Sequence, residues 1–198
     1  MDRKIALYGY GGHAREVASQ IGESVTFFVD DKYSNEFVRP ISSFEPEKYL
    51  MMVAVSDCKS REDIVNRLPK DTKYLTFIHK TALILQDDIK IGEGSFIGAY
   101  SILTNNITIG KHAILNRANH IGHDCVIGDY FSAMPGSIVS GNVDIGNRVY
   151  LGTNSTVIEK NKICDDVIIG ANAVVIREIN EIGTYVGVPV KKINKQII

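Results

Sequence analysis

The chain has 198 residues, of which 44% are apolar, and its 22 Lys and Arg against 23 Asp and Glu give a formal net charge of −1. This balance argues against a general nucleic-acid or bilayer binder, and no apolar run reaches the 18 residues typical of a membrane-spanning helix. The three cysteines lack paired spacing, so we expect reduced thiols. Met1 to Lys4 lead into a strand without the apolar region of a signal peptide, so we expect a cytoplasmic protein.

The first 78 residues alternate short apolar runs with amphipathic stretches, which is typical of strands joined by helices in a parallel sheet. The segment is roughly half the size of a full dinucleotide domain, so it predicts an α/β half-Rossmann (βαβαβ) domain over residues 1–78 that binds one nucleotide. We expect strands over residues 4–8, 25–29, 51–55 and 74–78, and helices over residues 14–21 and 60–68.

The turn after the first strand, Gly9-x-Gly11-Gly12-His13-Ala14, matches a loose dinucleotide pattern, and Asp30-Asp31 end the second strand where a ribose-binding acid would lie. Glycine N–H groups at a helix N-terminus stabilise an anion, and His13 could add a ring donor. Three interpretations stay open here: a purely structural turn, a phosphate or nucleotide site, and an NAD site.

From Leu85 to Val175 every sixth residue is apolar, and small or β-branched residues precede many of them by two positions. Six residues hold one short strand and a corner, so three such units close one triangular coil. The repeat therefore predicts a parallel β-helix over residues 79–177. Residues 178–198 are expected to form a C-terminal tail. Glycine follows eight of the sixteen apolar residues, where we expect a positive φ. Because flat walls stay exposed, we expect a homotrimer.

One coil, residues 116–124, concentrates polar side chains while keeping Ile121 inward. His123 is a candidate general base because its ordinary pKa suits proton removal at neutral pH, and Asp124 could hold its tautomer. Cys125 falls on an inward position and is expected to fill the core. The repeat's other histidines are His112 and His120, and their spacing does not resemble the three-histidine zinc site of γ-class carbonic anhydrases, so we expect no metal.

These motifs together resemble the sugar O-/N-acetyltransferases of the left-handed β-helix class, a family that includes the bacillosamine-pathway acetyltransferase and sialic acid O-acetyltransferase. The resemblance implies an N-terminal domain that holds the nucleotide of an activated amino sugar, and acetyl-CoA in the groove between neighbouring β-helices of a trimer. The matching stretches are residues 9–13, Asp30-Asp31, and residues 123–128, 140–143, 152–155 and 187–191.

The resemblance also implies site residues. His123 would be the catalytic base, assisted by Asp124, while the Gly141 N–H would bind the thioester oxygen. Gly11, Gly12 and His13 would contact the diphosphate or sugar, and Asp30, Asp31 and Ser56 would hold the nucleoside. The residues implied for CoA are Ser132, Gly141, Thr153, Ala171 and Lys191. Lys191 lies beside Lys192 and Lys195 in the sequence. Some relatives have Glu, His and Gly where this chain has Asp124, Ser132 and Ser56.

The function implied is transfer of an acetyl group from acetyl-CoA, as cosubstrate, to the 4-amino group of a nucleotide-linked 4-amino-4,6-dideoxy sugar in bacterial glycan or O-antigen biosynthesis. Direct attack in a ternary complex requires no cysteine or serine nucleophile. Two alternatives remain, a sialic acid O-acetyltransferase and a non-catalytic trimer that binds a nucleotide sugar.

Overall fold

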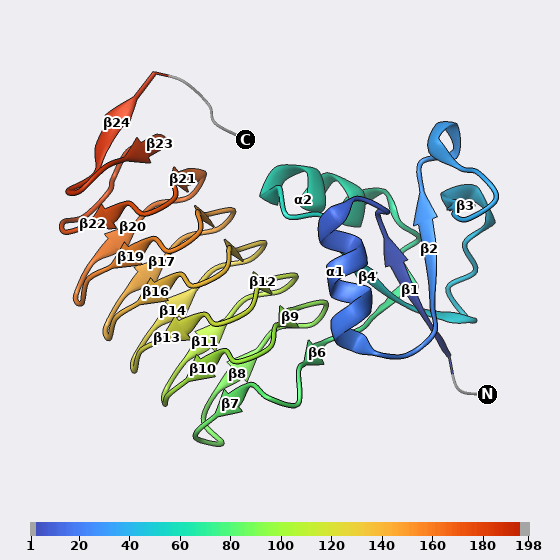
Figure 1. The fold of residues 1–198 in the computed structure, drawn as a ribbon, viewed down its shortest axis with the longest axis horizontal. Helices are drawn as coiled ribbons and strands as arrows, with labels where there is room; N and C mark the ends of the chain where they lie inside the picture. The colour runs from blue at the N-terminus through green and yellow to red at the C-terminus, as the bar shows by residue number, and fades with distance from the viewer. Residues whose placement is uncertain (1–2, 195–198) are drawn as a thin grey trace.

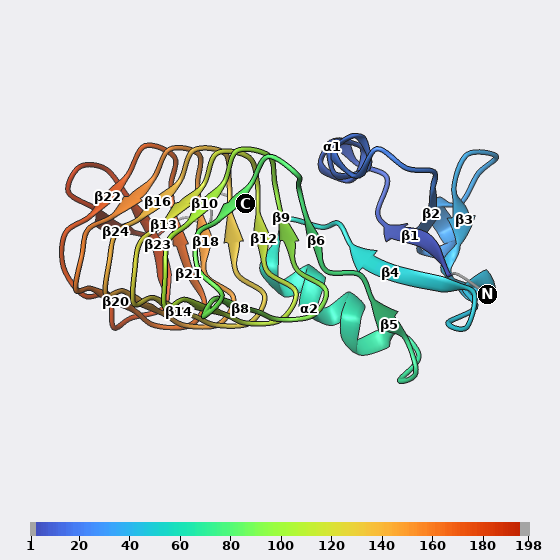
Figure 2. The same cartoon turned by 90° about the horizontal axis from the view of Figure 1, so that it is seen from below.

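The computed structural model describes residues 3–194 and consists of a small α/β domain docked on a prism of short parallel strands (Figure 1). The N-terminal sheet is parallel, in the order β3-β2-β1-β4-β5. Ala6, Leu7 and Tyr8 are all buried because a helix covers each face of the sheet, as Figure 2 shows. The elements are β1 (Lys4–Tyr8), α1 (Gly12–Ile21), β2 (Val25–Val29), η1 (Asp31–Tyr33), β3 (Arg39–Pro40), η2 (Ile41–Ser43), β4 (Tyr49–Val53), α2 (Cys58–Arg67) and β5 (Lys73–Tyr74).

The sheet follows the predicted order of strands and helices, with two differences. The predicted strand over residues 74–78 is two strands: β5 pairs with β4, and β6 (Phe77–Ile78) pairs with β9 of the prism. The two-residue edge strand β3 gives no periodic signal in the sequence. Helix α2 begins where the Asp57 carboxylate accepts a hydrogen bond from the Ser60 N–H at 2.9 Å.

The prism has three walls of parallel strands, and this confirms the predicted fold class of an α/β domain followed by a β-helix of hexapeptide repeats. The domain wall contains β6, β9 (Phe96–Ile97), β12 (Ile114–Leu115), β15 (Ser132–Ala133), β18 (Tyr150–Leu151) and β21 (Val167–Ile169), followed by β23 (Gly183–Val186) and the antiparallel β24 (Lys191–Ile193). The open wall contains β7 (Leu83–Ile84), β10 (Ile102–Leu103), β13 (His120–Ile121), β16 (Ile138–Val139), β19 (Thr156–Val157) and β22 (Val174–Val175). The third wall contains β8 (Lys90–Ile91), β11 (Thr108–Ile109), β14 (Val126–Ile127), β17 (Asp144–Ile145) and β20 (Lys162–Ile163).

The predicted aliphatic ladder fills the prism from Ile97 to Val175, where every member is buried. Leu85 is an exception, because 52% of its surface is exposed. Leu103 pairs with Ile84 in the coil below it and with Ile121 in the coil above it, so the first coil contains one extra residue. The prediction that the ladder begins at Leu85 was therefore wrong by one position.

The glycines after the aliphatic residues have a different role from the one expected. Positive φ falls instead on the third residue after each ladder position from Ile91 to Ile169, as at Ala118 (57°) and Arg148 (55°). A Cβ added to Gly92 would lie 2.5 Å from the backbone of Gly110, and one on Gly122 would lie 2.7 Å from the Gly141 nitrogen. These glycines are required because stacked coils approach each other closely, not because of their φ.

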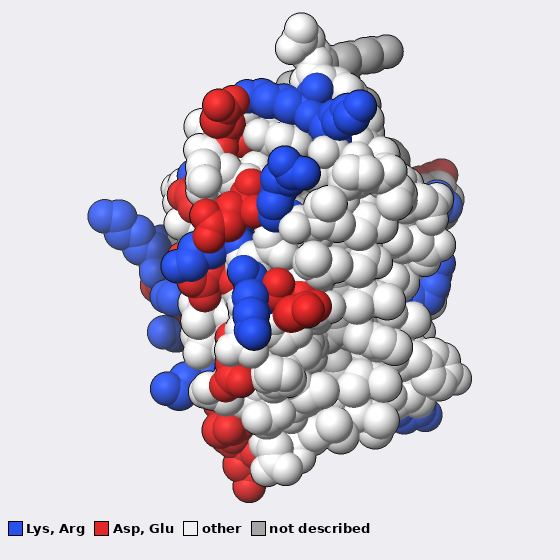
Figure 3. Space-filling model, turned by 90° about the vertical axis from the view of Figure 1, so that its left-hand side faces the viewer, with Lys and Arg blue, Asp and Glu red and all other residues white. Residues whose placement is uncertain are grey.

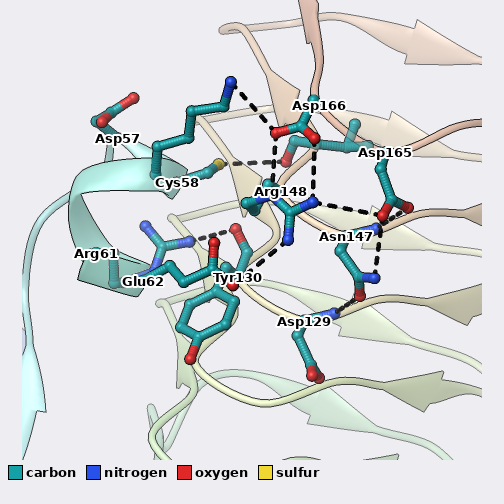
Figure 4. A network of polar contacts seen from close by, with 12 residues as sticks. Asp57, Cys58, Arg61, Glu62, Asp129, Tyr130, Asn147, Arg148, Asp165 and Asp166 are labelled. Atoms are coloured by element: carbon teal, nitrogen blue, oxygen red, sulfur yellow. Dashed lines mark hydrogen bonds and ion pairs between the residues drawn. The ribbon is translucent and has the colours of Figure 1, made fainter. Parts of the chain in front are cut away.

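The N-terminal domain is fixed to the domain wall by a buried arginine of α2, drawn in Figure 4. Arg61 is 1% exposed. Its guanidinium donates to the carbonyls of His112 (2.8 Å), Tyr130 (2.6 Å) and Phe131 (3.0 Å) on the prism, and of Val55 (2.6 Å) and Ser56 (3.2 Å) in its own domain. One side chain therefore satisfies backbone acceptors on both sides of the interface.

Candidate active site and nucleotide pocket

His123, Asp124 and Gly141 lie together at the corner between the open wall and the third wall, which we call the far corner because it is opposite the domain wall in the triangular coil. The Asp124 Oδ2 lies 2.7 Å from His123 Nδ1. A Cβ added to Gly141 would be 2.5, 2.7 and 2.9 Å from His123 Nε2, Cε1 and Cδ2, so the face of the imidazole lies over the backbone of the next coil, where any side chain would displace the ring.

The arrangement prepares the imidazole for proton transfer. Asp124 accepts hydrogen bonds from Asn106 Nδ2, at 2.6 Å, and from His123, and these bonds hold the pKa of its carboxyl below the usual range. An ionised carboxylate at Nδ1 accepts the N–H there and leaves the Nε2 lone pair free to accept a proton. Asn106 was not identified from the sequence, although it precedes Asp124 by one 18-residue coil.

Two other polar residues of this coil are structural. Asn116 and Asn119 are buried, and Asn119 Nδ2 donates to the Asn116 carbonyl at 2.6 Å. The Cys125 thiol points inward as predicted and donates to the Ser140 carbonyl at 3.1 Å. His120 lies exposed on the open wall.

A cavity of about 730 Å³ lies at the carboxyl ends of β1 and β2, on the α2 side of the sheet. Tyr8 OH donates to Asp30 Oδ1 at 2.6 Å, and Arg67 lies 3.1 Å from the same oxygen. The hydrogen bond from Tyr8 is the main reason that the pKa of the Asp30 carboxyl is low. Burial and the nearby Asp30 raise the pKa of the Tyr8 hydroxyl to about 12. The lining residues are Tyr8, Gly9, Val29, Asp30, Tyr33, Ser60, Asp63, Ile64, Asn66 and Arg67.

The predicted phosphate turn only partly joins this cavity. Gly9 lines it with a φ of 110°, but Gly11, Gly12 and His13 lie at the start of α1 on the opposite side of the sheet. A Cβ on Gly11 or Gly12 would meet nothing within 4 Å, so these residues border open space. Burial and the nearby Arg61 lower the pKa of His13 to about 4, which keeps its ring neutral.

Three other predicted residues have structural contacts. The Asp31 carboxylate accepts the Ser42 N–H at 3.0 Å and shapes the loop after β2. Ser132 is fully buried in the domain wall, and its hydroxyl donates to the Ser56 carbonyl at 2.7 Å. This placement gives Ser132 a contact between the two domains.

The remaining residues expected to contact CoA are exposed. Thr153 and Ala171 lie in successive coils at the corner between the domain wall and the open wall, and Lys191 lies on β24. Lys192 pairs with Glu181 at 3.0 Å. Lys195 lies outside the described residues.

Within residues 3–194, no three His, Cys, Asp or Glu side chains are arranged to hold a metal ion. None of the helices in this range has the length and apolar character needed to cross a membrane.

Comparisons with known proteins match both parts of the chain. Residues 4–68 match the PglD N-terminal domain family. GDP-perosamine N-acetyltransferase of Escherichia coli O157:H7 is 28% identical over 183 residues, which cover 83% of this chain and 82% of that protein.

Three solved structures have nearly the whole fold. WeeI from Acinetobacter baumannii AYE has a TM-score of 0.86 at 28% identity, covering 97% of this chain and 100% of that one. The acetyltransferase domain of PglB from Neisseria gonorrhoeae FA1090, in complex with acetyl coenzyme A, has a TM-score of 0.85 at 27% identity and covers 98% and 100%. A histidine-to-asparagine variant of perosamine N-acetyltransferase from Caulobacter crescentus, in complex with CoA and GDP-perosamine, has a TM-score of 0.85 at 26% identity and covers 97% of each chain.

Proposed function

We propose, from the premise that this chain is an acetyl-CoA-dependent N-acetyltransferase of the left-handed β-helix sugar acetyltransferase family, that its acceptor is the 4-amino group of a nucleotide-linked 4-amino-4,6-dideoxy sugar. The observation that carries the proposal is the geometry of the far corner. There an ionised Asp124 bonds to Nδ1 of His123, and the face of the imidazole lies over Gly141. The similarity to proteins that bind CoA and GDP-perosamine supports the choice of substrates.

The chemistry follows from these three groups. As the sugar nitrogen attacks the thioester carbon, His123 Nε2 takes the proton that the nitrogen loses, and the Gly141 N–H stabilises the negative charge developing on the thioester oxygen. When the carbon–sulfur bond breaks, the imidazolium returns the proton to the CoA sulfur. The products are the N-acetyl sugar and CoA thiol.

The N-terminal domain packs on the domain wall, whereas His123 lies at the opposite corner of the coil, and this separation supports an active site that combines the pocket of one chain with the base of another. The open wall offers a surface for a second copy. Leu83 and Ile138 are 52% and 39% exposed there, and Figure 3 shows a broad uncharged face beside a charged strip. The outward residues of this wall are Leu83, Ile102, His120, Ile138, Thr156 and Val174.

We therefore expect a homotrimer whose active sites combine a pocket from one subunit with His123 of its neighbour. His123→Ala and Asp30→Ala subunits, each impaired alone, should regain activity when co-expressed, because random assembly leaves roughly a quarter of the sites intact. Light scattering on the same sample measures the assembly. A fully active monomer would contradict the prediction.

Replacing Asp30 with alanine should raise KM for the nucleotide sugar by about tenfold or more, since a lost hydrogen bond to a charged group weakens binding by about 1.5–3 kcal/mol. KM for acetyl-CoA should stay unchanged, because Asp30 lies in the pocket of the N-terminal domain. Equal weakening of both substrates would indicate a folding defect instead.

The substrate is tested by following thiol release from acetyl-CoA with UDP-, dTDP- and GDP-linked 4-amino-4,6-dideoxy sugars and with sialic acid. Turnover with one of the amino sugars is expected. Turnover with sialic acid alone would favour the O-acetyltransferase alternative, whereas nucleotide-sugar binding without CoA binding would favour the non-catalytic trimer.

A further inference from the structure

The far corner contains a third side chain that bonds to the His123–Asp124 pair. Asn106 stands one coil below Asp124, and both residues have left-handed backbones, with φ of 50° and 59°. The Asn106 N–H donates to Asp88 Oδ1 at 2.9 Å, which fixes its main chain, and its Nδ2 donates to Asp124 Oδ1 at 2.6 Å. Each oxygen of the Asp124 carboxylate therefore has its own partner, Asn106 on Oδ1 and His123 on Oδ2.

This second partner matters because the pair lies at the surface. The side chains of His123 and Asp124 are 55% and 42% exposed. An exposed pair of this kind is worth only about 0–1 kcal/mol, and its carboxylate is free to rotate into water. A donor on the other oxygen removes that freedom. Because the donor is a neutral amide, the carboxylate keeps its full charge toward the imidazole.

We propose that Asn106 is a positioning residue for the general base: it holds the Asp124 carboxylate in the orientation that fixes the His123 tautomer and places the imidazole over Gly141. The proposal rests on the proposed function, since it assigns Asn106 a role in the same proton transfer. The titratable groups placed against this unit are Asp88, through the Asn106 backbone, and the buried Cys125 thiol, which bonds to the His123 carbonyl.

The test compares Asn106→Ala with Asn106→Gly, because glycine adopts the positive φ freely and so separates loss of the amide from backbone strain. Both variants should lower kcat by about three- to tenfold, the loss expected for one hydrogen bond, with KM unchanged for both substrates. Melting temperatures show whether either variant is unfolded. If alanine alone lowers kcat, strain is the cause and the proposal is wrong.

The pH profile of kcat gives a readout that a merely structural role would not move. In Asn106→Ala, a loosely held Asp124 stabilises the imidazolium less, so the acidic limb should shift to lower pH. In Asn106→Asp, a second negative charge favours the imidazolium, so the limb should shift to higher pH. Unshifted limbs in both variants would overturn the proposal.

The His123→Ala background separates this inference from the proposed function. There Asn106→Ala should cause no further loss, because the amide acts only through the ring. If His123→Ala is itself fully active, the proposed base is wrong and Asn106 loses its role with it. If His123→Ala is inactive while both Asn106 variants retain full kcat, only the positioning role is overturned.

Discussion

Replacing His123 with alanine is expected to lower kcat by about 10²- to 10⁴-fold, which is the usual contribution of a positioned general base. The affinities for CoA and the sugar should stay nearly unchanged, because the loss falls on a group that acts in the transition state. Steady-state kinetics with both substrates varied measures the effect. The acidic limb of the kcat profile should also flatten, since the proposed base is removed.

Two companion variants sharpen this result. Asp124→Ala should cost less than His123→Ala, and the double variant should be little worse than His123→Ala alone. If His123→Ala kept more than about half of the activity at neutral pH, another base or a self-deprotonated amine would have to act.

Replacing Arg61 with alanine should lower the free energy of unfolding by about 3–5 kcal/mol, among the largest effects of any single change in this chain. The side chain is fully buried, and its removal takes a donor from five backbone carbonyls, of which only those of Ser56 and Phe131 keep another, from the Ser132 hydroxyl and the Ile114 N–H. Arg61→Lys should recover only part of the loss, because an ammonium has three donors and lacks the planar fork. Urea unfolding monitored by circular dichroism measures both.

The matched control is Arg67→Ala on the same helix. The Arg67 side chain is 59% exposed and has one ion pair, with Asp30, so its loss should cost no more than about 1 kcal/mol. Similar destabilisation by both substitutions would mean that the helix, and not the buried guanidinium, is the sensitive element. Limited proteolysis between residues 68 and 77 should accelerate in Arg61→Ala alone.

The β-helix was predictable because its signal is local and repeats many times: each inward aliphatic residue is fixed by a period of six along the chain itself. The same assumption of a strict period produced the error at Leu85, where one inserted residue shifts the first coil. The role of the glycines depends on contacts between coils 18 residues apart, so only the stacked structure shows it.

The candidate site divides in the same way. His123 and Asp124 are neighbours in the sequence, and their pairing was predicted. Asn106 was missed because its partner lies a full coil away, although an 18-residue offset from Asp124 would have pointed to it. Arg67 was missed because no local pattern shows that the end of α2 meets the end of β2.

The stacked coils are evenly spaced along the axis of the prism. Neighbouring parallel strands are spaced by about 4.8 Å, so equivalent corner residues such as Thr153 and Ala171 mark successive rungs along the axis. Adding or deleting one 18-residue coil above His123 would keep the core in phase while changing the distance from the base to β24 by one rung. The number of coils therefore sets this distance in steps of about 4.8 Å, without a change in any wall.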